Sequence, residues 1–173
     1  MKLFAEDYVA HILRVVKDCD ETVTKAANVI RNSSKEGKTL WILGNGGSLA
    51  LAQHFAQDLV KLRGIRAQTV NCPSIITAYT NDVDFEQSFA LPLDIIRRDG
   101  DPVMIFSCSG SSRNYREIAD SKAYRPLIAV VGTDGGFLRD AADVCIHVRD
   151  ENYQLCETAF SLIADLINFE LEE

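Results

Sequence analysis

A regular alternation of short apolar runs and helical stretches constrains the fold of this 173-residue chain more than any other feature. Most of the runs are continuously apolar, as in strands that are buried on both faces of a sheet. Strands that alternate with helices in this way form a parallel sheet with helices packed on both sides. The pattern predicts an α/β fold of three layers (helix, sheet, helix) with five strands. We expect the strands at residues 39–43, 67–70, 102–106, 127–131 and 144–148.

The chain before the first run is expected to form two helices with no strand between them. Val9, Ile12 and Val16 recur at helical spacing, and a second helix is expected over 22–34. Residues 1–36 are then a helical pair, and residues 37–173 are the α/β core of a single domain. The pair is free to pack on another subunit, which favours an oligomer. Further helices are expected at 48–63, 74–80, 85–91, 112–121, 137–142 and 152–170.

Composition limits the cellular compartments and the classes of binding partner that we expect. Asp and Glu outnumber Lys and Arg by 25 to 18, and the net charge of −7 argues against broad binding to nucleic acid or anionic membranes. No apolar run approaches the roughly 18 residues that span a bilayer. The acidic residues Glu6 and Asp7 do not suit a secretory signal. The five cysteines form no CxxC pair and are expected to be reduced thiols, so we predict a cytoplasmic protein.

Two loops at expected strand ends share one composition. Residues 44–48 read Gly-Asn-Gly-Gly-Ser, and residues 107–112 read Ser-Cys-Ser-Gly-Ser-Ser. Ligands bind at this edge of open α/β sheets. Glycine lets the backbone approach a ligand, serine donates hydrogen bonds, and free N–H groups at a helix start favour an anion. Ser48 and Ser112 stand at expected N-caps, and simple capping is the alternative role. Because two such loops occupy equivalent positions, we favour a phosphate site.

Nucleotide-binding motifs fit these loops less well. A P-loop needs a lysine after its last glycine, and none follows Gly46 and Gly47. The dinucleotide fingerprint GxGxxG is only half met, because Leu49 stands at its third glycine. Several serines around one anion favour a sugar phosphate instead. A third strand-end loop, residues 132–136, either approaches the ligand or is a plain glycine-rich turn.

The two Ser/Gly motifs, with Ala-Gln-His-Phe-Ala at 52–56 between them, resemble the SIS (sugar isomerase) domain family, and most closely its phosphoheptose isomerase branch. The resemblance covers essentially the whole chain. It implies a flavodoxin-like sheet, a homotetramer with active sites between subunits, and zinc as the one cofactor. The implied reaction converts sedoheptulose 7-phosphate to D-glycero-D-manno-heptose 7-phosphate, an early step toward bacterial surface heptose. The implied binding residues are Asn45, Gly46, Gly47, Ser48, Asp82, Ser107, Cys108, Ser109, Ser112 and Gln154.

Aldose–ketose isomerisation moves a proton between two carbons, so it needs a base near carbon and an acid or a metal near oxygen. His54 and Asp58 are four residues apart and share one face of the helix expected at 48–63. Such a pair can also bind zinc, and a hydrogen-bonded histidine at a helix contact is the alternative. Phosphoheptose isomerases have a glutamate at the position of Asp58, taken as base and zinc ligand. We expect Asp58 as base and His54 as acid, with His54, Asp58 and Gln154 as metal ligands.

The last helix departs from the family pattern. Gln154 matches a family glutamine, but Leu162 stands where a histidine acts as acid or base and as zinc ligand. Glu157 can supply a replacement catalytic carboxylate, and a surface or intersubunit salt bridge is its alternative role. Leu62 stands where the family has an arginine. Three hypotheses stay open: a heptose phosphate isomerase, an isomerase for another phosphosugar, and a SIS protein that binds a phosphosugar or a protein partner without chemistry.

Three aromatic residues are expected to serve the fold rather than the site. His11 is expected to be exposed on the first helix, and His147 to be structural within its strand. Trp41 lies in an apolar run and is expected in the core.

Overall fold

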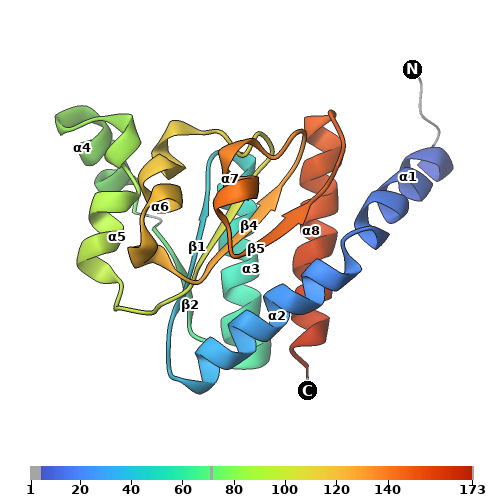
Figure 1. Ribbon diagram of the computed structural model, residues 1–173, viewed down its shortest axis with the longest axis horizontal. Helices are drawn as coiled ribbons and strands as arrows, with labels where there is room; N and C mark the ends of the chain where they lie inside the picture. Colours follow the sequence, from blue (N-terminus) through green and yellow to red (C-terminus); the bar gives the residue numbers. More distant parts are fainter. Residues whose placement is uncertain (1–4, 71, 173) are drawn as a thin grey trace.

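The computed structural model describes residues 5–70 and 72–172, and it has the predicted three-layer α/β architecture (Figure 1). Residues 1–4 of the expected helical pair, and residues 71 and 173, lie outside the described residues. One parallel sheet holds the five strands in the order β2-β1-β3-β4-β5, which is the flavodoxin-like order. The strands are β1 (Leu40–Gly44), β2 (Ala67–Thr69), β3 (Val103–Ser107), β4 (Leu127–Val131) and β5 (Val144–His147).

The strands form where the sequence is apolar because both faces of the sheet are covered. Ile42 pairs with Met104 and Leu43 with Ile105 in the β1–β3 ladder, and all four side chains are 0% exposed. Ile42 and Met104 face one core, whereas Leu43 and Ile105 face the other. The predicted strand boundaries are correct to within one residue.

Two sets of helices cover the two faces (Figure 1). The side that carries Ile42 packs against the four longest helices, and the side that carries Leu43 packs against four shorter ones. The first set is α1 (Ala5–Lys17), α2 (Asp20–Lys35), α3 (Gly47–Arg63) and α8 (Tyr153–Glu170). The second set is α4 (Pro73–Asp82), α5 (Ala90–Ile96), α6 (Arg116–Asp120) and α7 (Gly136–Ala141).

Several helix boundaries differ from the sequence-based expectation. The helix expected at 85–91 is a short 3₁₀ turn at Phe85–Gln87 followed by α5, because Asp84 accepts a hydrogen bond from the Gln87 N–H and closes a separate turn. The helix expected at 112–121 is likewise a 3₁₀ turn at Arg113–Tyr115 followed by α6. Helix α4 runs to Asp82, so the loop expected after residue 80 is its last turn.

The α1 helix extends beyond the edge of the sheet in Figure 1 and packs on α8. His11 is half-buried there, with Nε2 2.6 Å from Asp150 Oδ2, so the expectation of an exposed His11 is wrong. His147 Nε2 lies 2.9 Å from the Thr133 carbonyl oxygen, a contact that ties β5 to the loop after β4. Trp41 is 5% exposed and donates to Asp101 Oδ2 at 3.1 Å, as its predicted core position requires.

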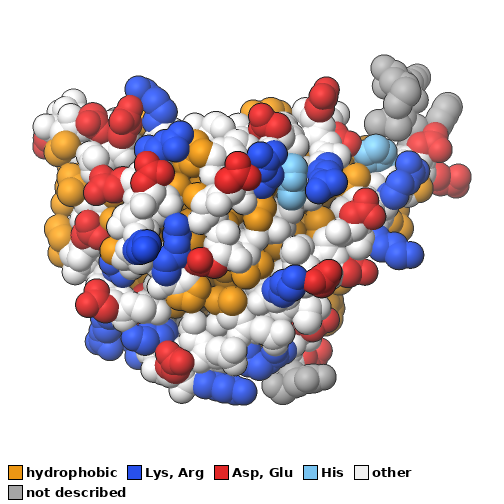
Figure 2. All heavy atoms as spheres, in the orientation of Figure 1, with side chains coloured by type: hydrophobic (Ala, Val, Ile, Leu, Met, Phe, Trp, Pro, Cys, Tyr) orange, Lys and Arg blue, Asp and Glu red, His pale blue; other side chains and the backbone are white. Residues whose placement is uncertain are grey.

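Acidic and basic side chains intermingle over the face shown in Figure 2, with apolar patches between them. Within residues 5–70 and 72–172, no helix combines the length and the apolar character that a membrane span needs.

Candidate active site

The ends of β1 and β3 lie side by side, and the loops that follow them enclose a cavity of about 140 Å³. The strand order reverses between these two strands, which is where open α/β sheets bind ligands. The structure therefore brings together most of the predicted phosphate-binding side chains. The cavity is lined by Asn45, Ser48, Phe106, Ser107, Cys108, Ser109, Ser112, Tyr115, Tyr153 and Glu157.

The first loop turns sharply because three glycines allow it. A Cβ on Gly44 would collide with the Ser48 carbonyl group, and Gly46 has φ +54°, which favours glycine. The turn makes Gly46 the N-cap of α3, so the expectation that Ser48 is the N-cap is wrong. Ser48 lies inside the first helical turn, 7% exposed, and lines the cavity. The Ser48 N–H donates to the Asn45 carbonyl and the Leu49 N–H to the Gly46 carbonyl, each at 3.1 Å, so α3 favours an anion here through the positive end of its dipole.

The second loop organises its own serines. The Gly110 N–H donates to Ser107 Oγ at 3.1 Å, and the Ser111 N–H donates to Ser109 Oγ at 3.2 Å. Each of these hydroxyls accepts one bond from the loop and keeps its own proton to donate to a ligand. Ser112 is the N-cap of the following 3₁₀ turn but makes no capping hydrogen bond. Its hydroxyl therefore has no capping role that competes with ligand binding.

The third strand-end loop supports the second. A Cβ on Gly110 would collide with the Gly135 carbonyl, and one on Gly136 would collide with Ser111 Oγ. The Leu138 N–H also donates to the Gly110 carbonyl at 3.1 Å. None of residues 132–136 lines the 140 Å³ cavity, so in the single chain this loop buttresses the site.

Asn114 is a site residue that the sequence did not reveal. It is 1% exposed, and its side-chain amide exchanges two hydrogen bonds of 3.0 Å with the amide of Asn45. Its nitrogen also lies 3.5 Å from Ser88 Oγ. The pair joins the first loop to the chain after the second loop, across 69 residues of sequence, so no local pattern signals it.

A second cavity of about 280 Å³ adjoins the first and shares Ser48 and Glu157 with it. His54 also lines this second cavity, and its Nε2 lies 3.3 Å from Asp58 Oδ2. Asp58 lines neither cavity, and its side chain is 18% exposed against 66% for His54. The expected base therefore lies behind the expected acid. Glu157 is the carboxylate at the cavities, with Oε1 2.8 Å from where a Cβ on Gly47 would stand.

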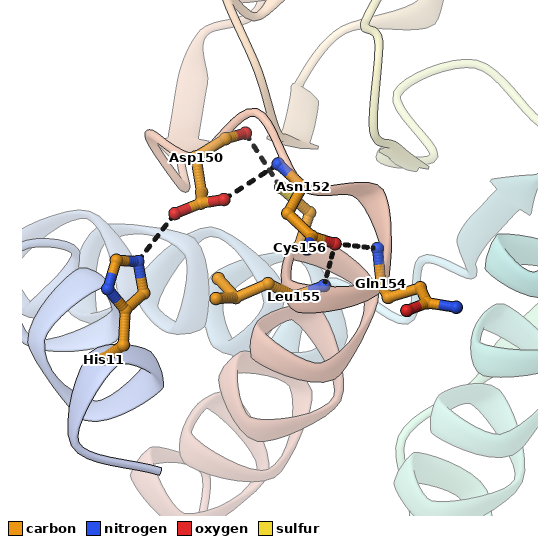
Figure 3. Close-up of polar contacts among 6 residues, drawn as sticks. All are labelled: His11, Asp150, Asn152, Gln154, Leu155 and Cys156. Carbon is orange, nitrogen blue, oxygen red and sulfur yellow. Dashed lines mark hydrogen bonds and ion pairs between the residues drawn. The ribbon is translucent and has the colours of Figure 1, made fainter. Parts of the chain in front are cut away.

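The single chain does not bring Asp82 or Gln154 to either cavity. Asp82 is exposed at the end of α4 and accepts a hydrogen bond from its neighbour Asn81. Gln154 is exposed in the first turn of α8, and its side chain points away from Asp150 (Figure 3). Asn152 caps this helix by accepting from the N–H groups of Gln154 and Leu155, at 3.0 and 3.2 Å.

The donor set of one chain does not fit zinc. Across the described ranges, no three His, Cys, Asp or Glu side chains come together as a possible metal site. His54 and Asp58 supply two donors, whereas a protein zinc site takes three or four. Leu162 carries no donor and packs against the core on the α8 side of the sheet.

Cys108 lies in the cavity as a neutral thiol. Burial, with smaller contributions from the nearby Cys156 and Glu157, raises its pKa to about 12. A thiol at that pKa is not a nucleophile at neutral pH. No disulfide joins the five cysteines, as expected for reduced thiols.

The fold and the two cavities define a class of protein: a parallel α/β domain in which two serine-rich loops, a carboxylate and an imidazole surround space suited to a phosphorylated ligand. Residues 4–132 match the model of the SIS domain family. The chain belongs to the SIS domain family, in its phosphoheptose isomerase branch.

Two curated relatives agree with this assignment, and a solved structure agrees with the fold. The phosphoheptose isomerase of Cytophaga hutchinsonii is 33% identical over 155 residues, which cover 84% of this chain and 81% of the relative. That of Geotalea uraniireducens is 35% identical, covering 84% of this chain and 83% of the relative. A phosphoheptose isomerase structure from Francisella tularensis superposes with a TM-score of 0.88 at 22% identity, over 96% of this chain and 93% of that one. The two curated relatives place the chain among the isomerases of this family.

Proposed function

We propose that the chain converts sedoheptulose 7-phosphate to D-glycero-D-manno-heptose 7-phosphate. The observation that carries the proposal is that the serines of both loops share one cavity with Glu157. A phosphate fits the serine side, because hydroxyl protons and the N-terminus of α3 favour an anion. The carboxylate and His54 then lie on the side of the adjoining cavity, toward the sugar. The names of the relatives support a heptose phosphate as the substrate.

In the proposed reaction, a carboxylate takes a proton from C1 of the ketose while an acid protonates the carbonyl oxygen at C2. The resulting enediol loses the O1 proton and regains a proton at C2, which gives the aldose. We assign the base to Glu157 rather than to Asp58, because Glu157 lines both cavities and Asp58 lines neither. Asp58 then orients His54, which serves as the acid. Each proton-transfer group of this type contributes about 10²–10⁴-fold to a rate.

The proposal routes no step through zinc, because one chain supplies two of the needed donors. We also propose a homotetramer in the cytoplasm. Val9 and Leu13 on α1 are 53% and 56% exposed, and a second copy would bury them. Such contacts would also decide whether Asp82 and Gln154 reach the site of a neighbouring subunit.

The alternative candidate is a SIS protein that binds a phosphosugar without turning it over. Leu162 favours it, because it removes a side chain that the family uses for proton transfer. The test is proton NMR in D₂O with sedoheptulose 7-phosphate, with and without added zinc. Deuterium at C1 or a new aldose signal supports the isomerase, and zinc dependence would indicate a metal site completed by another subunit. Ligand-induced stabilisation without exchange supports the binder.

A further inference from the structure

Among the described residues that line the 140 Å³ cavity, only Tyr115 has a buried side-chain polar atom without a hydrogen-bond partner, which is its hydroxyl oxygen. Its side chain is 0% exposed, and its hydroxyl makes no hydrogen bond. A buried hydroxyl in this state costs about 1–3 kcal/mol, so folded proteins keep few of them. The other buried side chains with an unpartnered atom are Gln87, Arg97 and Arg125, and none of these lines the cavity.

The surroundings hold the Tyr115 ring firmly. The ring stacks on Phe89 with centroids 5.7 Å apart and planes 4° from parallel. The preceding residue, Asn114, is fixed by its amide pair with Asn45. The ring is therefore placed by packing that does not need its hydroxyl.

The hydroxyl is a donor at all physiological pH values, because burial raises its pKa well above the usual value. The nearby backbone N–H of Asn45 lowers the pKa of Tyr115 by a smaller amount, so the hydroxyl lies beside the first loop. The hydroxyl nevertheless forms no hydrogen bond with a described residue. Ser48, Ser107, Ser109 and Ser112 lie around the same small space.

We propose that the Tyr115 hydroxyl donates a hydrogen bond to the phosphate group of the ligand, alongside the serine hydroxyls. The inference rests on the proposed function, which puts the phosphate of a phosphosugar in this cavity. The hydroxyl is shielded from water in the free chain, so the first loop must shift slightly when phosphate enters. The bond then satisfies a donor that the free protein leaves unpaired, and this favours the bound state.

The test compares Tyr115→Phe with a matched variant, Tyr124→Phe. Tyr124 is 2% exposed, but its hydroxyl donates to Asp94 Oδ1 at 2.8 Å and the residue lines neither cavity. Melting is followed for each intact protein against inorganic phosphate and against sedoheptulose 7-phosphate. We expect Tyr115→Phe to melt at or above the wild-type temperature without ligand. We expect it to bind both ligands about tenfold or more weakly, as for a lost hydrogen bond to a charged group.

Tyr124→Phe should show the reverse: a lower melting temperature and unchanged phosphate affinity. Wild-type phosphate affinity in Tyr115→Phe would overturn the inference and leave the isomerase proposal intact, and so would a large loss of stability without ligand. Phosphate binding that depends on Tyr115, together with no deuterium exchange, would uphold the inference and overturn only the proposed reaction. Absence of phosphate binding by the wild type would overturn both.

Discussion

Replacing Glu157 with Gln separates the two carboxylates that compete for the role of base. The change removes the charge but keeps the size of the side chain at the junction of the two cavities. If Glu157 abstracts the C1 proton, turnover of sedoheptulose 7-phosphate falls by at least about 100-fold, which corresponds to about 2.7 kcal/mol in the barrier. Stability changes far less, because the carboxylate is exposed and its interaction with the N-terminus of α3 is worth about 0.3–1 kcal/mol.

Phosphate affinity is a second measurement, and we expect Glu157→Gln to raise it while it lowers turnover. Glu157 shares the smaller cavity with the serines, so its negative charge opposes a bound phosphate. Glu157→Gln should therefore bind inorganic phosphate more tightly while losing turnover. A general loss of structure would weaken both properties together. Only a group at the cavity can move them in opposite directions.

The assay is deuterium incorporation at C1, measured by NMR beside a phosphate titration followed by melting. Asp165→Asn is the control, since it removes an exposed carboxylate from the same helix outside both cavities. Asp58→Asn should have a smaller effect than Glu157→Gln, because Asp58 acts through His54. If Asp58→Asn abolishes exchange while Glu157→Gln retains it, the base is Asp58 and the assignment made from the cavity lining is wrong.

Three further results are expected. Asn114→Ala should lower the free energy of unfolding by about 1–3 kcal/mol in denaturant titrations and weaken phosphate binding, because it leaves the Asn45 amide unpaired; full phosphate affinity would contradict this role. Gly110→Ala should abolish phosphate binding in a melting assay, because its Cβ collides with the third loop and its φ of +61° disfavours alanine. Burial raises the pKa of Cys108 to about 12 and of Cys19 to about 11, so these thiols ionise at lower pH in the unfolded chain than in the folded one. The free energy of unfolding is therefore at its full value below about pH 9 and falls as the pH rises toward 12. Cys19→Ala should make this fall smaller, as measured by denaturant titrations at pH 8 and 10.

The sheet was predictable because burial on both faces leaves a direct record in the sequence. Runs such as Leu127–Val131 are apolar at every position, since alternate side chains enter two different cores. The helix starts near the site were less predictable. Serine is a common N-cap residue, so the N-cap was expected at Ser48, but the backbone freedom of Gly46 places the N-cap two residues earlier, at Gly46 itself. This turn is selected by the close packing of Gly44 against Ser48, and the helix propensities of the local residues do not predict that packing.

The part of the site that lies within single loops was predictable from the sequence. The part that depends on contacts between residues far apart in the sequence was not. The glycines and serines of the two loops stand together in the sequence, whereas the Asn45–Asn114 pair and the position of Glu157 beside Gly47 arise only from the fold. This division has a physical basis. Phosphate binding uses backbone N–H groups and short hydroxyls on rigid turns, so it requires particular residues at consecutive positions.

Proton transfer makes a different demand, because any helix that passes the cavity can present an acid or a base. On α8, Leu162 packs into the core, while Glu157 lies five residues earlier and faces both cavities. On α3, the carboxylate of Asp58 lies behind His54 rather than at the cavity. The phosphate site can therefore stay intact while the catalytic groups move among neighbouring helices. By this reasoning, the choice of sugar and of base depends on α3 and α8, and the two loops determine only that the ligand carries a phosphate.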